Sequence, residues 1–258
     1  MIDIDIIESK ENKNYKLIKK LNKKKYRDAN NIFIAEGEKF FEESKNFNQI
    51  VINESNYEYY NNKYDLSQYN RVTVLKDNLF KEISTQENSQ GIIFIYSKFA
   101  KNIEDIVGDI VILDDVQDPG NVGTIIRTMV ALNYENLILT KGSVDVYSPK
   151  VIRASMGGIF NINVIYEEAD KIIDFLKEKE YECFATALDE TSVDYRELKL
   201  KDNKNAYVFG HEGGGVSKKF LDFSKKAIIP ISDKVNSLNV SVALAVFLYK
   251  MREIGGKL

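Results

Sequence analysis

From Ile110 onward the sequence alternates short apolar runs with segments of helical spacing, and no other feature constrains the fold as much. The runs expected to form strands are residues 110–113, 137–139, 160–166, 183–188, 206–210 and 226–230. The segments expected to form helices begin near Asn121 and then cover 149–158, 172–180 and 240–252. Strands that alternate with helices predict a mostly parallel, doubly wound α/β sheet flanked by helices.

The region before Ile110 predicts a smaller α/β unit. Residues 12–26 carry Leu17, Ile18 and Leu21 at helical spacing among lysines, which indicates one helix with an apolar stripe. The expected strands of this region are Ile32–Ala35, Gln49–Ile52, Arg71–Leu75 and Gly91–Tyr96. We therefore expect a first domain over residues 1–97, a polar connection over 98–109 and a second domain over 110–258.

Composition limits the chemistry. The 258 residues contain one cysteine, Cys183, and one histidine, His211, so neither an internal disulfide framework nor a metal site of several Cys or His residues is expected. No run of about eighteen apolar residues is present, so no membrane span is expected. The N-terminus is acidic and then basic, without the apolar stretch of a secretory signal. A cytoplasmic enzyme without a metal fits these limits.

Charge is segregated along the chain. The net charge is −3, yet residues 10–27 hold nine basic residues and one acidic residue, Glu11. A concentrated basic segment is what contacts with nucleic-acid phosphates require. Lys20, Lys23, Lys24 and Arg27 are therefore candidate RNA contacts, and a solvated lysine-rich helix face is the alternative.

Three stretches of the second region combine polar residues with turns and helix starts: 113–139, 208–217 and 228–253. Taken singly, each has an ordinary explanation. Asn121 and Asn239 could be helix caps, Arg127 lies off the apolar stripe of its helix, and a glycine-rich loop is often only a turn. The GHEGGG loop is neither a Walker A loop nor a GxGxxG dinucleotide fingerprint.

Together and in this order, the three stretches resemble the signature motifs of the SpoU/TrmH family, which are S-adenosylmethionine-dependent RNA ribose 2′-O-methyltransferases of the knotted SPOUT class. Pro119, Asn121, Gly123 and Arg127 match the first motif, P-x-N-x-G-x-x-x-R. Glu212 is the acidic residue of the second, G-x-E-x-x-G. The chain departs from the family at Thr124, where alanine is usual, and at His211, where asparagine or serine is usual.

Two further stretches extend the resemblance. Residues 15–44 and 84–97 are similar to the substrate-binding domain that precedes the catalytic domain in many members, which implies a fold related to RNA-binding ribosomal proteins. Residues 143–164 resemble the family's S-P-K-x-x-R-A-S-x-G signature, which implies that Arg153 is an RNA phosphate contact.

The resemblance also implies the fold and the roles at the site. The catalytic domain would carry a trefoil knot, and the family forms homodimers. Arg127 would lie next to the ribose 2′-hydroxyl as a base or as an electrostatic stabiliser, Asn121 and Glu212 would orient it, and Ser237 and Asn239 would hold the substrate or the arginine. The cofactor, S-adenosylmethionine, would be held by Thr186, Ala187, Phe209, Gly210, Gly214, Ile229 and Leu238.

The sequence leaves three functions open, of which an RNA ribose 2′-O-methyltransferase is the first. The expected substrate is structured RNA, with ribosomal RNA favoured over transfer RNA. A knotted dimer that binds RNA without methylating it is an alternative from another class. A methyltransferase that modifies nucleobases instead of ribose is the third.

Overall fold

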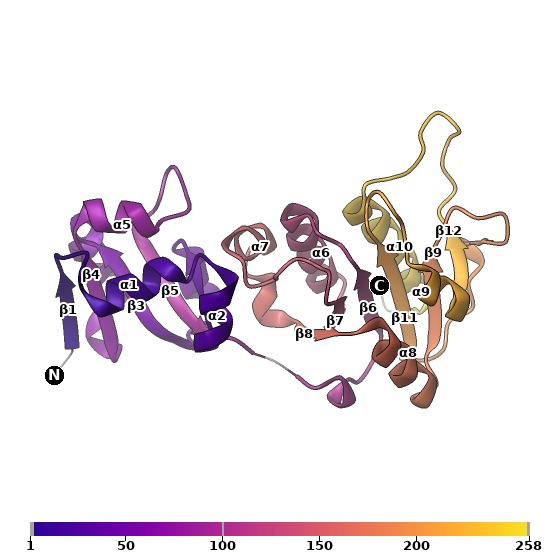
Figure 1. Ribbon diagram of the computed structural model, residues 1–258, viewed down its shortest axis with the longest axis horizontal. Coiled ribbons are helices and arrows are strands. Elements are labelled where there is room, and N and C mark those ends of the chain that lie inside the picture. The colour runs from indigo at the N-terminus through magenta and orange to yellow at the C-terminus, as the bar shows by residue number, and fades with distance from the viewer. Residues whose placement is uncertain (1–2, 100, 257–258) are drawn as a thin grey trace. The chain divides into compact units, whose positions relative to one another are not determined.

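The computed structural model describes residues 3–99 and 101–256. Its internal contacts divide the chain into two units (Figure 1). Unit 1 contains Met1–Lys98 together with Asp145–Phe160, and unit 2 contains Phe99–Val144 together with Asn161–Leu258. Unit 1 thus includes a segment that lies inside the expected second domain, 110–258, in the sequence.

Unit 1 is built on a five-stranded sheet in the order β1-β4-β3-β5-β2. β1, β4 and β3 are parallel, and β5 is antiparallel to both β3 and β2. The strands are β1 (Asp3–Ile7), β2 (Ile32–Glu36), β3 (Phe47–Asn53), β4 (Arg71–Leu75) and β5 (Ile92–Ser97). The helices are α1 (Lys13–Lys20), α2 (Lys24–Asn30), α3 (Lys39–Glu43), α4 (Tyr57–Tyr64), α5 (Asp77–Ile83) and α7 (Pro149–Ser155).

The prediction of one helix over residues 12–26 is wrong, because the chain forms two. Asn12 caps α1 by accepting hydrogen bonds from the N–H groups of Asn14 and Tyr15, and α1 ends at Lys20. Lys23 is extended, and α2 then starts in a new direction. Tyr15, Ile18 and Leu21 are buried in one core with α5, while α2 directs Arg27 inward.

Unit 2 contains a seven-stranded sheet in the order β10-β12-β9-β11-β6-β7-β8, and every described pair of strands is parallel. The strands are β6 (Ile110–Asp114), β7 (Asn136–Thr140), β8 (Asn163–Glu167), β9 (Glu182–Thr186), β10 (Val193–Asp194), β11 (Asn205–Gly210) and β12 (Lys225–Ile228). The helices are α6 (Pro119–Ala131), α8 (Ala169–Glu178), α9 (Lys218–Phe223) and α10 (Val240–Ile254).

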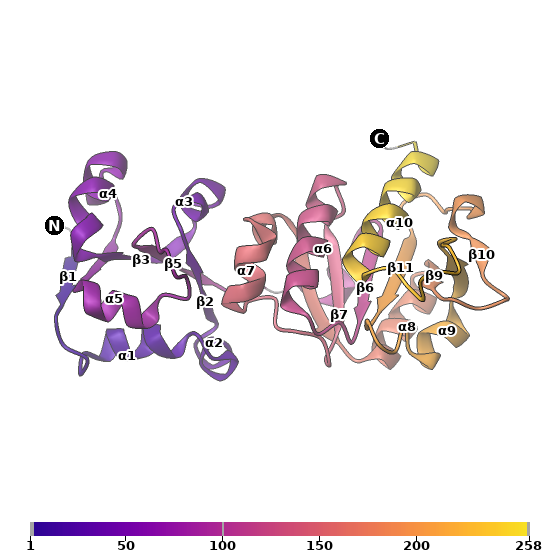
Figure 2. The same ribbon diagram turned by 90° about the horizontal axis from the view of Figure 1, so that it is seen from above.

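Helices cover both faces of this sheet. Side chains of successive strand residues point to opposite faces. Ala206 and Val208 of β11 pack in one core with α8 and α9, whereas the Tyr207 and Phe209 rings lie 5.8 and 5.6 Å from Phe247 of α10. Figure 2 shows α6 and α10 side by side, and the two helices are in contact. The doubly wound sheet expected from the sequence is therefore confirmed.

The sheet order determines where unit 2 can bind a ligand. β11 lies between β9 and β6, so strands that are distant in the sequence end side by side. Open parallel sheets bind ligands in the crevice at the carboxyl ends of their strands. Among the helices of residues 3–99 and 101–256, none has the length and apolar character that spanning a membrane requires.

Candidate active site

A cavity of about 550 Å³ lies at the carboxyl ends of β9, β11 and β12. The segments that follow these three strands supply nearly all of its lining. All the cofactor contacts that the resemblance implies are part of that lining: Thr186, Ala187, Phe209, Gly210, Gly214, Ile229 and Leu238. The strand order thus brings together residues that are about fifty positions apart in the sequence.

The loop after β11 is closed into a defined turn by its own backbone. His211 and Gly215 exchange two backbone hydrogen bonds, of 3.1 and 2.8 Å, and Gly215 has a φ of +67°. A Cβ atom at Gly210 would lie 2.0 Å from the backbone of Gly215, so only glycine fits there. The His211 Nδ1 atom accepts a hydrogen bond of 3.0 Å from the Gly213 N–H, which gives this histidine a role in the loop's own structure.

Asn121 is not the cap of α6. Asp118 fills that position, because its carboxylate accepts the Asn121 N–H at 2.7 Å, and Pro119 follows at the start of the helix. The helix therefore begins two residues earlier than the sequence predicts, and the Asn121 side chain is available for other contacts. The sequence did contain the signal, an aspartate immediately before a proline.

The Asn121 amide connects the three signature stretches. Its Nδ2 atom donates to Glu212 Oε1 at 2.5 Å, and its Oδ1 atom accepts from Asn239 Nδ2 at 3.0 Å. Asn239 also caps α10, accepting hydrogen bonds from the N–H groups of Ser241 and Val242. One side chain each from α6, the β11 loop and the start of α10 thus form a continuous hydrogen-bonded chain.

Ser241 is a member of this network that the sequence analysis missed. Its hydroxyl lies 2.6 Å from Asn239 Oδ1 and 3.5 Å from Asn121 Oδ1, and its side chain is buried. A serine in the first turn after a cap residue has many ordinary explanations, so the sequence alone could not have distinguished it.

Arg127 and Ser237 lie outside the network. Arg127 is exposed on α6, while Val122, Ile125, Ile126 and Met129 of the same helix are buried, as their spacing predicts. Its guanidinium makes no hydrogen bond or ion pair with the residues that the structure describes. Ser237 lines the cavity from the segment between β12 and α10.

Asp189 is an ionised carboxylate in the lining of the cavity. The Lys226 Nζ group donates to its carboxylate at 2.7 Å, and both the hydroxyl and the N–H of Thr191 donate to it as well. These hydrogen bonds hold the pKa of Asp189 well below its ordinary value, so it stays ionised at neutral pH. Its neighbours Thr186 and Ala187 were expected cofactor contacts, but Asp189 was not.

The expected RNA contacts of unit 1 separate into two groups. Lys20, Lys23, Lys24 and Arg153 are exposed. Arg27 is only 2% exposed, and its guanidinium is bound to Asp145 and to the Leu21 carbonyl, so a direct phosphate contact by Arg27 is wrong. Helical spacing could not show this, because the expected helix ended at Tyr26 and the partner Asp145 is far away in the sequence.

Comparison with known proteins gives the family. Residues 109–249 match the SpoU rRNA Methylase family model, and residues 12–93 match the MRM3-like substrate binding domain. The chain belongs to the SpoU rRNA methylase family.

The chain is 30% identical over 247 residues to the 23S rRNA (guanosine(2553)-2′-O)-methyltransferase RlmP of Bacillus subtilis. This alignment covers 95% of the present chain and 98% of RlmP. It is 32% identical, over 55% of its own length and 54% of the relative's, to the 23S rRNA (adenosine(1067)-2′-O)-methyltransferase of Streptomyces azureus. The AdoMet-bound rRNA methyltransferase of Sinorhizobium meliloti superimposes with a TM-score of 0.85 at 27% identity, covering 97% of this chain and 98% of that one.

These findings confirm the α/β fold class, the RNA ribose 2′-O-methyltransferase class and S-adenosylmethionine as the cofactor of this SpoU-family protein. The cavity suits that cofactor on its own chemistry. Its volume lies in the range of roughly 300–1,000 Å³ that small-molecule sites occupy, and Gly210, which lines it, has no side chain to collide with the returning backbone at Gly215. Ala227, Ile229 and Leu238 offer an apolar surface for an adenine ring.

Proposed function

We propose that this SpoU-family enzyme methylates a ribose 2′-hydroxyl of ribosomal RNA, and that transfer RNA is not its main substrate. Two relatives named above act on 23S rRNA. The N-terminal match to a substrate-binding domain and the exposed lysines of α1 and α2 support binding to a large structured RNA. A ribosomal RNA substrate also favours a cytoplasmic location for the enzyme.

The observation that carries the site assignment is the Asn121 hydrogen-bond chain. It joins all three signature stretches, and Glu212 and Ser237 line the same cavity as the expected cofactor contacts. Residues kept only for stability would have no reason to converge at the edge of a ligand-sized cavity. A binding protein without activity would not require this convergence.

The chemistry follows from the weakness of a hydroxyl nucleophile. The cofactor supplies an electrophilic methyl group when it is bound. The protein must then stabilise the negative charge that develops on the 2′-oxygen as its proton passes to solvent or to an RNA phosphate. Arg127 suits this role as a cation, because a guanidinium is a permanent charge and a poor base. Its exposed guanidinium, without a described protein partner, is open to an RNA oxygen.

The other proposed roles are orienting ones. Asn121 and Glu212 would orient the ribose and, once RNA is bound, Arg127, and Ser237 would contact substrate from the loop before α10. Asn239 fixes Asn121 and the start of α10 together. Lys20, Lys23, Lys24 and Arg153 would contact RNA phosphates.

We further propose a homodimer. Val242, Val246 and Tyr249 are exposed at spacings of four and three residues, which places them on one face of α10. An apolar stripe on a helix is normally covered by another surface.

The experiment measures transfer of tritium from labelled S-adenosylmethionine to RNA by the full chain. Transcribed 23S rRNA and total transfer RNA, both free of modification, are compared, and the products are digested to nucleosides. The proposal expects label in a 2′-O-methylnucleoside of 23S rRNA. Label in transfer RNA would refute the substrate, label in a base would refute the ribose assignment, and cofactor binding without any transfer would favour the RNA-binding alternative.

A further inference from the structure

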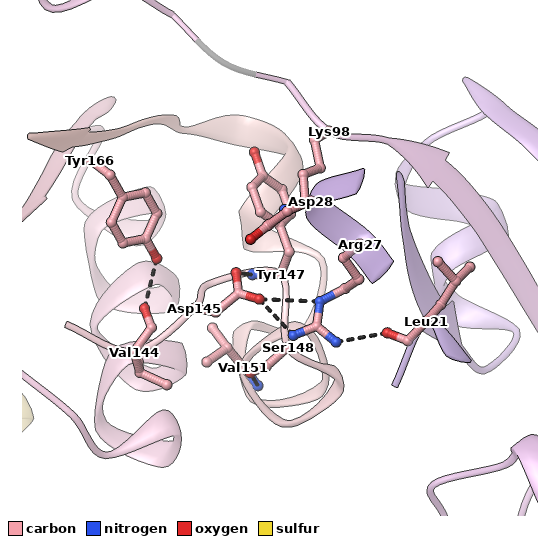
Figure 3. A network of polar contacts seen from close by, with 10 residues as sticks. All are labelled: Leu21, Arg27, Asp28, Lys98, Val144, Asp145, Tyr147, Ser148, Val151 and Tyr166. Atoms are coloured by element: carbon pink, nitrogen blue, oxygen red, sulfur yellow. Dashed lines mark hydrogen bonds and ion pairs between the residues drawn. The ribbon is translucent and has the colours of Figure 1, made fainter. Parts of the chain in front are cut away.

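Arg27 and Asp145 form a buried ion pair within unit 1 (Figure 3). Both Nε and Nη2 of Arg27 donate to Asp145 Oδ2, at 3.1 and 2.6 Å, and Nη1 donates to the Leu21 carbonyl at 2.7 Å. The two side chains are 3% and 9% exposed. A buried charge without its partner is unfavourable, so each residue depends on the other for its place.

The pair anchors the start of the segment Asp145–Phe160. The second oxygen of Asp145 accepts the Tyr147 N–H at 3.0 Å, and Ser148 caps α7. The Tyr147 ring lies 4.9 Å from that of Phe33 on β2. At the other end of the segment, Phe160 lies 4.7 Å from Tyr96 on β5. Polar and aromatic contacts thus hold both ends of the segment on the sheet of unit 1.

Between these anchors, α7 places Arg153 beside the loop that follows α5. Arg153, Thr85, Gln86 and Glu36 line one small recess. The Glu36 carboxylate accepts the Thr85 N–H at 2.8 Å and the Ser89 hydroxyl at 2.6 Å, so this loop has a defined conformation. Arg153 is exposed and makes no ion pair with a described residue, so its charge faces outward.

We propose that the Arg27–Asp145 pair is a clamp that seats α7 on unit 1, and that it supports RNA binding through Arg153. Arg27 and Asp145 are positioning residues in this scheme, and Arg153 is the phosphate contact. The inference rests on the proposed RNA function. It predicts that loss of a negative charge, at Asp145, lowers the affinity for RNA, although RNA is itself a polyanion.

The test measures the affinity of the full chain for transcribed 23S rRNA over a range of salt concentrations. Removing a negative charge should strengthen RNA binding if long-range electrostatics alone matter. The clamp predicts instead that Asp145→Ala weakens binding several-fold and reduces the salt slope by about one, as loss of a single phosphate contact does. Glu58→Ala is the matched control, since Glu58 is an exposed carboxylate of unit 1 on α4.

Non-additivity gives the second readout. Arg153→Ala should match Asp145→Ala in affinity and slope, and the double variant should be no weaker than either single one. Equal or tighter binding by Asp145→Ala, or losses that add in the double variant, would overturn the clamp. Asp145→Asn keeps an acceptor for Arg27, so it should show a smaller loss and serves if the alanine variant does not fold.

Cofactor affinity, measured by calorimetry, should be unchanged in all these variants, because the cavity belongs to unit 2. If the wild-type chain prefers transfer RNA, the proposed substrate fails, and the same comparison on transfer RNA still decides whether the clamp exists.

Discussion

Asn121 shows how one residue can have two plausible roles in a sequence and only one in the structure. Asp118 caps α6, and the Asn121 amide bridges Glu212 and Asn239. An amide is suited to this position because it donates to the carboxylate on one side and accepts from the other amide on the opposite side. Neither an aspartate nor an aliphatic side chain can do both.

Asn121→Asp should therefore place two carboxylates in contact. We expect turnover to fall by about a hundredfold at neutral pH through misplacement of the site. Repulsion raises the pKa of such a pair, so one proton should return as the pH falls and activity should partly recover. Single-turnover methyl transfer from about pH 8 to about pH 5.5 measures this. Asn121→Ala, which adds no charge, should show no recovery, and identical pH profiles for the two variants would contradict the bridge.

Arg127 permits the most direct test of the chemistry. If it stabilises the charge that develops on the 2′-oxygen, its contribution is made mainly in the transition state. Arg127→Ala should then lower the single-turnover rate at saturating RNA by roughly two to four powers of ten. Arg127→Lys should recover only part of the rate, because an ammonium lacks the guanidinium fork. Cofactor affinity should not change. A near wild-type rate for the alanine variant would show that Arg127 has no catalytic role and is only a surface residue.

At the scale of single residues, the sequence predicted which side chains matter better than it predicted their contacts. The exposure of Arg127 followed from helical spacing, and the cavity lining followed from the resemblance. The burial of Arg27 did not, because it depends on a break at Lys23 and on a partner, Asp145, that is more than a hundred residues away. Local patterns contain no information about such a pair.

Among the elements, α6 follows the Asp118 cap and carries two of the proposed catalytic residues, Asn121 and Arg127, so its first turn can be tested by itself. Asp118→Ala removes the acceptor of the Asn121 N–H and should cost about 1 kcal/mol of stability, the usual effect of losing a cap. Chemical denaturation followed by circular dichroism would measure it. Asp118→Asn, which keeps a capping oxygen, should retain most of the stability, and equal losses in both variants would argue that charge, not capping, is the cause.

Strands with long apolar runs were predicted well because burial on both faces demands such runs. β6, β7 and β11 are buried along their whole length. The elements that were missed are short or lie at a sheet edge: β1, the two-residue β10, α4 and α9. Their residues are mixed in polarity, so tertiary pairing, and not local periodicity, determines that they form.

At the scale of the whole molecule, the chain passes between its two units more often than a two-domain sequence suggests. A deletion of residues 1–97 would remove the surface on which Tyr147 and Phe160 pack and would leave Asp145 unpaired. Point substitutions such as Lys23→Ala are therefore a better test of the basic segment than truncation. The strand order and the threading of the chain also lay beyond any periodicity argument, and the trefoil knot was implied by the resemblance alone.

The exposed side of α10 indicates how the chain assembles. Val242, Val246 and Tyr249 are 49%, 38% and 59% exposed along one side of α10, whereas Leu244, Phe247 and Leu248 of the same helix are buried within unit 2. This division explains why the helix is apolar on more than one face, and it leaves one apolar stripe for a second copy of the chain. Light scattering at micromolar concentration should report a mass of about two chains.

Val246→Glu would place a charge in the middle of that stripe, and burying it without a partner opposes association. We expect this variant to be a monomer that remains folded, because Val246 makes no part of the buried core. Val107→Glu is the matched control, since Val107 is 84% exposed and belongs to unit 2 but lies outside α10. It should remain dimeric. If Val246→Glu scatters as two chains, or the wild-type protein is a monomer that still methylates RNA, then α10 does not form the interface and the stripe faces solvent or RNA instead.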